Sequence, residues 1–64
     1  MRLRVSEAVI LRREANNRRR LAAGTTDSQA RATLELIAKR LDREASAIET
    51  AIAENAAARQ RAAE

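Results

Sequence analysis

Arginine and asparagine side chains gather in the stretch RREANNRRR, residues 12–20. At about 100° per residue of an α-helix, five of them fall within about 120° of arc. These five are Arg12, Arg13, Asn16, Arg19 and Arg20. Guanidinium groups bind phosphate oxygens and guanine edges, and asparagine can pair with adenine. A helix face of this composition could bind RNA, duplex DNA or an acidic protein.

The same arginine face also fits a helix surface that only meets solvent. The chain contains no Phe, Tyr or Trp, so no side chain can stack on a base. Arginine is a good helix former and accumulates on exposed helix faces for that reason alone. We therefore expect Asn16, Arg19 and Arg20 to lie in solvent, with Asn17 and Arg18 nearer an interface. Arg18 can form an ion pair with Glu14, four residues before it.

The composition argues against catalysis. Histidine, cysteine and tyrosine are absent, and the chain has a single glycine, so neither a phosphate-binding loop nor a thiolate metal site is expected. The serines fit a helix cap, a first turn and an outer helix position, and the pair Asp42 and Glu44 is spaced so that the two carboxylates diverge on a helix. We predict a protein that is not an enzyme, with no metal, no cofactor and no small-molecule substrate.

The signals for local structure predict an all-α, two-helix antiparallel hairpin as a single domain over residues 1–64. The predicted helices span about 6–23 and about 27–58, with a loop at 24–26 and a frayed C-terminal end. Ser6 is expected to cap the first helix, and Gly24 to end it in the left-handed conformation. Thr26 and Gln29 fit a capping box that starts the second helix.

The longer second helix carries a seven-residue apolar repeat. Its a positions are Leu34, Leu41, Ile48, Asn55 and Ala62, and its d positions are Ala30, Ile37, Glu44, Ala51 and Ala58. Ala38, Ala45 and Ile52 add an e-position flank. This wide stripe is typical of a helix in a bundle rather than of a strict coiled coil. The polar residues Glu44 and Asn55 either are half-exposed or fix the register between chains.

The first helix carries two apolar stripes, which suggests that it contacts two neighbours. One stripe is Ala8, Leu11, Ala15 and Ala22, and the other is Leu3, Ile10 and Leu21. At about 1.5 Å per residue, the first helix should cover the second only to around Ala45. Ile48, Ala51 and Ile52 would then need cover from another chain.

A chain of 64 residues has too little core for a stable monomer and usually needs a disulfide, a metal or oligomerisation. Without cysteine or histidine, oligomerisation remains. We predict a homodimer, or a tetramer, with a four-helix-bundle core. The predicted interface residues are Ile10, Leu21, Leu34, Ile37, Leu41, Ile48 and Ile52.

The net charge of +4 is unevenly distributed. Seven arginines and two glutamates give residues 1–24 a net charge of +5, whereas residues 25–64 carry −1. No apolar run approaches the ~18 residues needed to cross a membrane, and the N-terminal segment does not have the pattern of a signal peptide. We expect a cytoplasmic protein that makes no membrane contact and whose partners are a second copy, nucleic acid or an acidic protein.

The stretch LRREANNRRRLAAGTTDSQARATLELIAKRLDREA, residues 11–45, resembles a pattern found in small uncharacterised helical proteins of proteobacteria. The matching positions are Ala15, Arg19, Leu21, Ala22, Asp27, Ala30, Arg31, Leu34, Ile37, Ala38 and Ala45. Those proteins often have an aromatic residue in place of Leu41 and a leucine in place of Glu44. The resemblance implies a bacterial helical hairpin and no known activity. In shape, the chain is also similar to short hairpin regulators that dimerise and bind RNA, although it carries no motif of theirs.

The function that these observations favour is a small non-enzymatic protein-interaction or adaptor module that acts as a homo-oligomer. The alternative is an RNA- or DNA-binding regulator that uses the arginine face. The two differ in their response to salt, because phosphate binding weakens steeply as salt rises.

Overall fold

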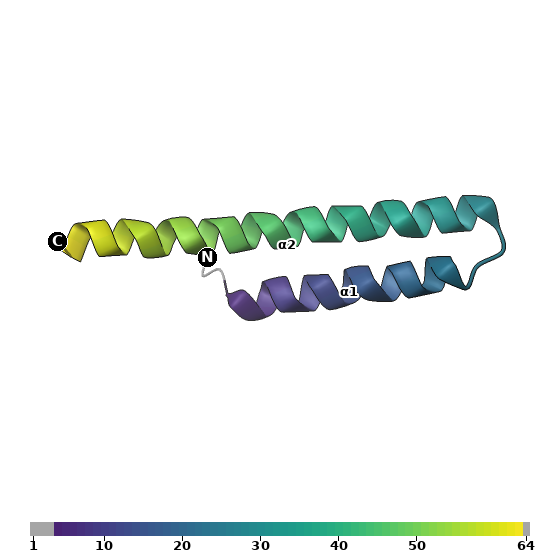
Figure 1. The fold of residues 1–64 in the computed structure, drawn as a ribbon, viewed down its shortest axis with the longest axis horizontal. Coiled ribbons are helices and arrows are strands. Elements are labelled where there is room, and N and C mark those ends of the chain that lie inside the picture. The colour runs from purple at the N-terminus through teal and green to yellow at the C-terminus, as the bar shows by residue number, and fades with distance from the viewer. Residues whose placement is uncertain (1–3, 64) are drawn as a thin grey trace.

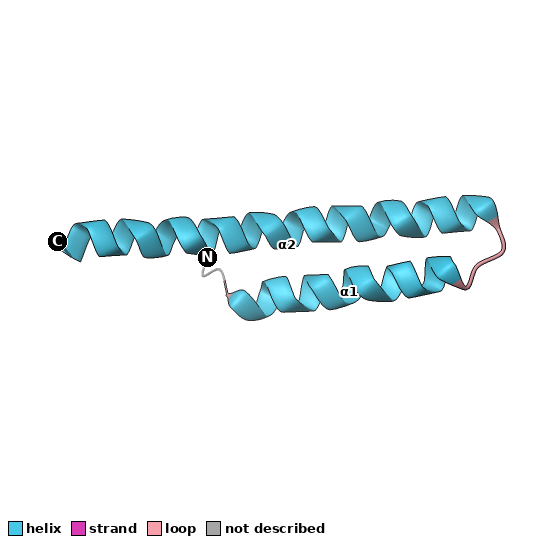
Figure 2. Ribbon diagram, viewed as in Figure 1, coloured by secondary structure: helices cyan, strands magenta, loops and turns pink. Residues whose placement is uncertain are grey.

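A computed structural model describes residues 4–63 as two antiparallel helices joined by a short loop (Figure 1). Helix α1 spans Val5–Ala23, and helix α2 spans Ser28–Ala63 and is nearly twice as long. No strand occurs within residues 4–63, and the four residues between the helices form the loop (Figure 2). The prediction of an all-α hairpin with a longer second helix is confirmed. Met1, Leu3 and Glu64 lie outside the described residues.

Helix α1 begins one residue earlier than predicted and without a side-chain cap. Arg4 is the extended residue before the helix, with φ −119° and ψ 143°, and its carbonyl accepts from the Glu7 amide at 3.0 Å. Ser6 therefore lies inside the first turn, and the prediction that it caps the helix is wrong. Glu7 does occupy the first turn, where a negative charge favours the helix dipole.

The end of α1 does not use a left-handed glycine. Gly24 has φ −88° and ψ −2°, which is a right-handed conformation open to any L-residue. The Thr25 amide donates to the Ala22 carbonyl at 3.2 Å, and the Thr25 hydroxyl donates to the Leu21 carbonyl at 2.7 Å. These bonds satisfy carbonyls that the end of a helix leaves without partners. The predicted left-handed Gly24 is therefore wrong, because Thr25 closes the last turn.

Asp27, rather than Thr26, caps the start of α2. Its carboxylate accepts from the amides of Gln29 at 3.0 Å and Ala30 at 3.5 Å. The loop thus occupies residues 24–27, one residue longer than predicted, and α2 starts at Ser28. Arg31 adds a second tie, because its guanidinium donates to the Thr25 carbonyl at 2.7 Å. The predicted capping box at Thr26 is wrong by one position, since aspartate is the stronger cap in this stretch.

Helix α2 continues to Ala63 instead of fraying near residue 58. Its last turns consist mostly of alanine, arginine and glutamine, which are strong helix formers, and no proline or glycine interrupts them. Figure 1 shows this end of α2 extending beyond the start of α1. From residue 53 onward the described side chains are exposed, so this segment overhangs the two-helix part of the molecule.

Among residues 4–63, the buried core of the hairpin is built only from alanine. The buried residues are Ala8, Ala15 and Ala22 of α1 and Ala38 and Ala45 of α2. Within each helix they are seven residues apart, so they form one line along it. We call these five residues the alanine seam. Side chains this small let two helices approach closely. The sequence interpretation placed Ala38 and Ala45 on the flank of the α2 stripe, whereas the structure makes them its centre.

The register of the hairpin covers more of α2 than predicted. Arg12 of α1 contacts Glu49 of α2, so the N-terminal half of α1 lies beside the segment that was expected to be uncovered. Ile48, Ala51 and Ile52 are accordingly half-buried within one chain. The prediction that nothing in the same chain covers them is wrong. The 24–27 loop carries the chain along the axis, so that α2 begins beyond the end of α1 (Figure 1).

The hairpin is long and thin, with extents of 56 × 17 × 15 Å and a radius of gyration of 15.9 Å. A compact domain of this length would have a radius of gyration of about 11 Å. The accessible surface is 5270 Å², whereas about 4,100 Å² is typical of a folded monomer of this mass. One hairpin therefore exposes roughly 1,200 Å² more than a compact chain of the same size would.

Candidate interaction surfaces

One side of the alanine seam is a network of charged side chains that joins the two helices. Arg12 contacts three residues of α2: Asp42 at 3.3 Å, Ser46 at 3.2 Å and Glu49 at 2.5 Å. Arg19 also forms an ion pair with Asp42. We call these five residues the ion-pair face. The acceptors recur along α2 because an acidic side chain follows the apolar a position by one residue, as in Leu41-Asp42 and Ile48-Glu49.

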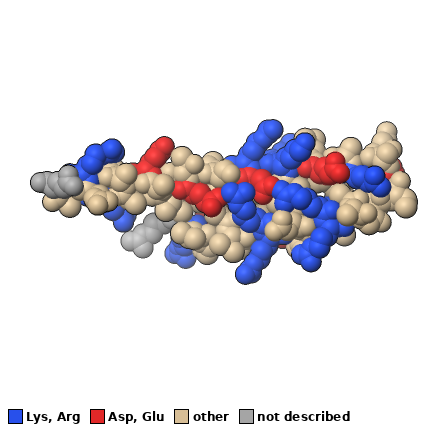
Figure 3. Space-filling view, viewed as in Figure 1, with Lys and Arg blue, Asp and Glu red and all other residues tan. Residues whose placement is uncertain are grey.

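The ion-pair face changes the interpretation of the arginine cluster. Arg12 and Arg19 point toward carboxylates of α2 rather than into open solvent, so their charge is largely balanced within the chain. Arg12 is half-buried, and Arg19, although exposed as predicted, is an ion-pair partner. Figure 3 shows the result as acidic side chains in a row with basic side chains on both sides of it. The predicted polyanion-binding residues are thereby divided into two that pair with carboxylates of α2 and three that do not.

Three of the five predicted polyanion-binding residues remain exposed without an ion pair among the described residues: Arg13, Asn16 and Arg20. The amide oxygen of Asn16 accepts from Arg19 at 2.7 Å, and that of Asn17 accepts from Arg20 at 2.7 Å. Asn17 is exposed in the single hairpin, so its expected position near an interface stays a prediction. These local bonds occupy both asparagine oxygens, which leaves less of each amide for reading a base.

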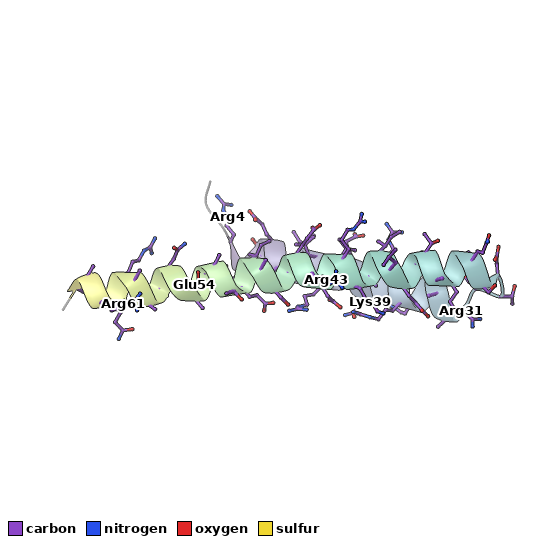
Figure 4. The ribbon with its side chains drawn as sticks, turned by 90° about the horizontal axis from the view of Figure 1, so that it is seen from above. Arg4, Arg31, Lys39, Arg43, Glu54 and Arg61 are labelled. Atoms are coloured by element: carbon purple, nitrogen blue, oxygen red, sulfur yellow. The ribbon has the colours of Figure 1, made fainter. Side chains whose placement is uncertain are left out.

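Helix α2 adds basic side chains of its own. Lys39 and Arg43 are exposed and lie on the part of α2 that runs alongside α1, while Glu54 and Arg61 lie toward its C-terminal end (Figure 4). Lys39 also lines a shallow groove between the helices with Arg19, Ala23 and Glu35. Exposed basic side chains therefore occur on both helices, although the net positive charge belongs to residues 1–24.

The other side of the alanine seam is apolar. Consecutive residues of a helix point in directions about 100° apart. Leu34, Leu41 and Ile48 therefore lie on one side of the alanine seam, and the acidic residue that follows each of them lies on the other side. We call this side the apolar face; it consists of Leu11 and Leu21 of α1 and Leu34, Ile37, Leu41 and Ile48 of α2. All six side chains are half-buried or exposed, and Leu21 keeps 53% of its surface accessible.

The predicted oligomer-interface residues mostly lie on this face or at its edges. Leu21, Leu34, Ile37, Leu41 and Ile48 belong to the apolar face. Ile10 is 58% exposed and lies at the outer edge of this face on α1, within about 20° of Leu21 in rotation. Ile52 is half-buried and continues the line of Ala38 and Ala45, so its side chain serves the contact between α1 and α2.

Three charged residues accompany the apolar face. Glu14 and Arg18 of α1 form an ion pair at 3.8 Å, as predicted. Arg18 is half-buried, and its Nε atom is buried without a hydrogen-bond partner. Glu44 lies on α2 in the row of Ile37 and Ala51, and it is exposed. These three charged side chains therefore lie beside the apolar face and not on the outer faces of the hairpin.

The residues that sequence reasoning missed are the partners of the arginines on α2. The sequence pattern predicts an outer helix position for Ser46 and indicates no partner for Asp42 or Glu49, yet all three accept from Arg12. A signal was present in the sequence, because Glu35, Asp42 and Glu49 recur every seven residues. Arg12 and Arg19 are also seven residues apart. Which acidic residue each arginine meets depends on the register of the two antiparallel helices, and packing between the helices sets that register.

Comparison with known proteins adds no relative. No protein-family model matches the chain, and neither a curated protein nor a solved structure is significantly similar to it. Among residues 4–63, neither helix has a stretch long and apolar enough to span a bilayer. Inferences about function therefore rest on the ion-pair face and the apolar face.

Proposed function

We propose that this protein is a small protein-interaction module that works as a homo-oligomer, with the apolar face of one hairpin packed on that of a second copy. The observation that carries the proposal is the composition of the core. Among the described residues, only alanines are buried, while every large apolar side chain keeps contact with solvent. Exposed apolar surface of this kind marks an interaction site.

The area left exposed is close to what a second copy would cover. Each chain exposes roughly 1,200 Å² more surface than a compact monomer of the same mass would. A standard interface buries about 800 Å² of each partner. Two hairpins packed through this face would form a four-helix bundle, in which helices place apolar rows toward a common centre. The ion-pair faces would then lie on the two outer sides of the bundle, where water solvates their charges.

Sedimentation equilibrium at micromolar concentration tests this proposal. We expect a mass of two chains, and a mass of four would still support a homo-oligomer. A folded species with the mass of one 7.1 kDa chain that persists as the concentration is raised would contradict it. Circular dichroism on the same samples confirms that the helices are formed in each species.

The second candidate function is binding of RNA or duplex DNA, and the exposed arginines favour it. Arg13 and Arg20 of α1 together with Lys39 and Arg43 of α2 present positive charge that no carboxylate among the described residues pairs with. The acidic row of the ion-pair face lies between these two basic groups and would repel a phosphate backbone. Replacing all four by glutamine should abolish any binding tighter than about micromolar at physiological salt, measured by titration at two salt concentrations.

A further inference from the structure

The proposed dimer could have its two-fold symmetry axis in either of two orientations. The charges beside the apolar face distinguish the two arrangements. An axis parallel to the helices places α1 of each copy on α2 of the other. An axis perpendicular to the helices, within the interface, places α1 on α1 and α2 on α2. In both cases each copy uses the same surface, as two-fold symmetry requires.

The ion pairs between the helices define which residues are level with each other. Arg12 contacts Glu49, and Arg19 contacts Asp42. In both pairs the residue numbers add to 61. Arg18 is therefore level with residue 43 of α2, directly beside Glu44 along the axis of the molecule.

The perpendicular axis would bring like charges together. The large apolar side chains of α2 run from Leu34 to Ile52, so such an axis would cross the face near residue 43. Each Glu44 would then approach Glu44 of the second copy, and each Arg18 would approach Arg18 of the second copy. Like charges in a partly dehydrated interface are unfavourable and select against that arrangement.

The parallel axis would bring opposite charges together. Here Arg18 of one copy lies over residues 43–44 of the other, so its guanidinium meets the exposed Glu44 carboxylate. In the single hairpin, Arg18 has one ion pair among residues 4–63, a 3.8 Å contact with Glu14, and its Nε is without a partner there. A carboxylate from the second copy would accept hydrogen bonds from the Arg18 guanidinium, which lacks a partner for its Nε in the single hairpin.

We propose that two copies associate about an axis parallel to their helices, with Arg18 of each copy paired to Glu44 of the other. This inference rests on the proposed function, because it assumes that the apolar face binds a second copy. Both loops then lie at one end of the bundle. The two overhanging ends of α2 lie together at the other end, where they form a paired platform of exposed helix.

Spin-label distances test the symmetry, because the chain contains no cysteine and a single label site can be introduced. Gln60→Cys places the label on the exposed overhang, and Thr26→Cys places it in the exposed loop. With the parallel axis, both variants should give distances under about 25 Å, since neighbouring bundle helices are about 10 Å apart. With the perpendicular axis, both should give about 45 Å or more, from about 1.5 Å per residue.

The charge at Glu44 supplies an independent test. Glu44→Gln should raise the dimer dissociation constant about fivefold if Arg18 of the other copy pairs with Glu44. It should lower that constant if two Glu44 carboxylates face each other. Glu54→Gln, on an exposed outer position of α2, is the matched control and should leave the constant unchanged.

The outcomes separate this inference from the proposed function. A dimer with long label distances, or one tightened by Glu44→Gln, would overturn the arrangement and leave self-association intact. A monomer at all concentrations would overturn both. Short distances at both sites with a weakened Glu44→Gln dimer would support both.

Discussion

The guanidinium of Arg12 in α1 donates to the carboxylate of Glu49 in α2 at 2.5 Å, although 37 residues of sequence separate them. This contact, together with those to Asp42 and Ser46, lies on one side of the alanine seam. Alanine side chains are nearly uniform and offer little that would specify how far one helix slides along the other. The charged contacts therefore contribute strongly to the register of the hairpin.

Arg12→Gln should lower the free energy of unfolding by about 1 kcal/mol, because it removes two ion pairs that are partly exposed to solvent. The loss should shrink in 1 M salt, which screens exposed charges. Urea unfolding at matched protein concentration measures it. Arg13→Gln is the control, since Arg13 is exposed and outside the ion-pair face. Equal losses for the two variants would contradict a specific role for Arg12.

Ala15→Leu should destabilise the hairpin by about 1–3 kcal/mol, because a larger side chain does not fit where two helices pack through alanine. Ala15 is fully buried, with 0% of its surface accessible. Ala47→Leu makes the same change at an exposed position of α2 and should change stability by less than about 0.5 kcal/mol. Thermal unfolding of both variants is the measurement. A neutral Ala15→Leu would mean that the helices are not in close contact at this residue.

Gly24→Ala should raise the free energy of unfolding by about 0.4–1 kcal/mol, because alanine restricts the unfolded chain more than glycine does. The native backbone at Gly24 is right-handed, and an added Cβ would meet only the Arg20 and Leu21 carbonyl oxygens at 3.8 and 3.9 Å. These are ordinary contact distances. A measured loss of stability would instead indicate the left-handed conformation that the sequence pattern suggested.

Asp27→Ala should cost about 1 kcal/mol, because the amides of Gln29 and Ala30 lose their acceptor at the start of α2. Asp27→Asn should retain most of the stability, since asparagine is an equally good cap. Thr26→Ala is the comparison that separates the two candidate caps. If Thr26→Ala proved the more damaging change in a denaturant titration, the cap would be one residue earlier than the structure has it.

Leu21→Asp should raise the dimer dissociation constant at least about tenfold, because it places an unpaired carboxylate on the apolar face. Leu36→Asp is the matched control, since Leu36 is similarly exposed, at 62% against 53% for Leu21, but lies on the outer side of α2. Sedimentation equilibrium compares the two. Similar dissociation constants for both variants would show that the apolar face is not the interface.

The sequence alone determined the secondary structure and the hairpin. Helix formers fill the chain, and the stretch from Gly24 to Asp27 holds poor helix formers in succession, so local preferences were enough to place two helices and one loop. Local preference also places the cap wrongly by one residue, because Thr26 and Asp27 are both good N-cap residues. The predicted end of α2 lies near residue 58, whereas α2 continues to Ala63, because strong helix formers without a breaker fill its last turns.

Only the tertiary structure decided which apolar row faces the other helix. The sequence repeat favours Leu34, Leu41 and Ile48 as the centre of the contact because they are large, whereas the structure buries Ala38 and Ala45. Close approach along alanine brings more of the two backbones into contact and allows Arg12 to reach Glu49. That choice depends on how the two helices pack against each other, which the local pattern of either helix does not encode. It also leaves the large side chains outside, available to a second chain.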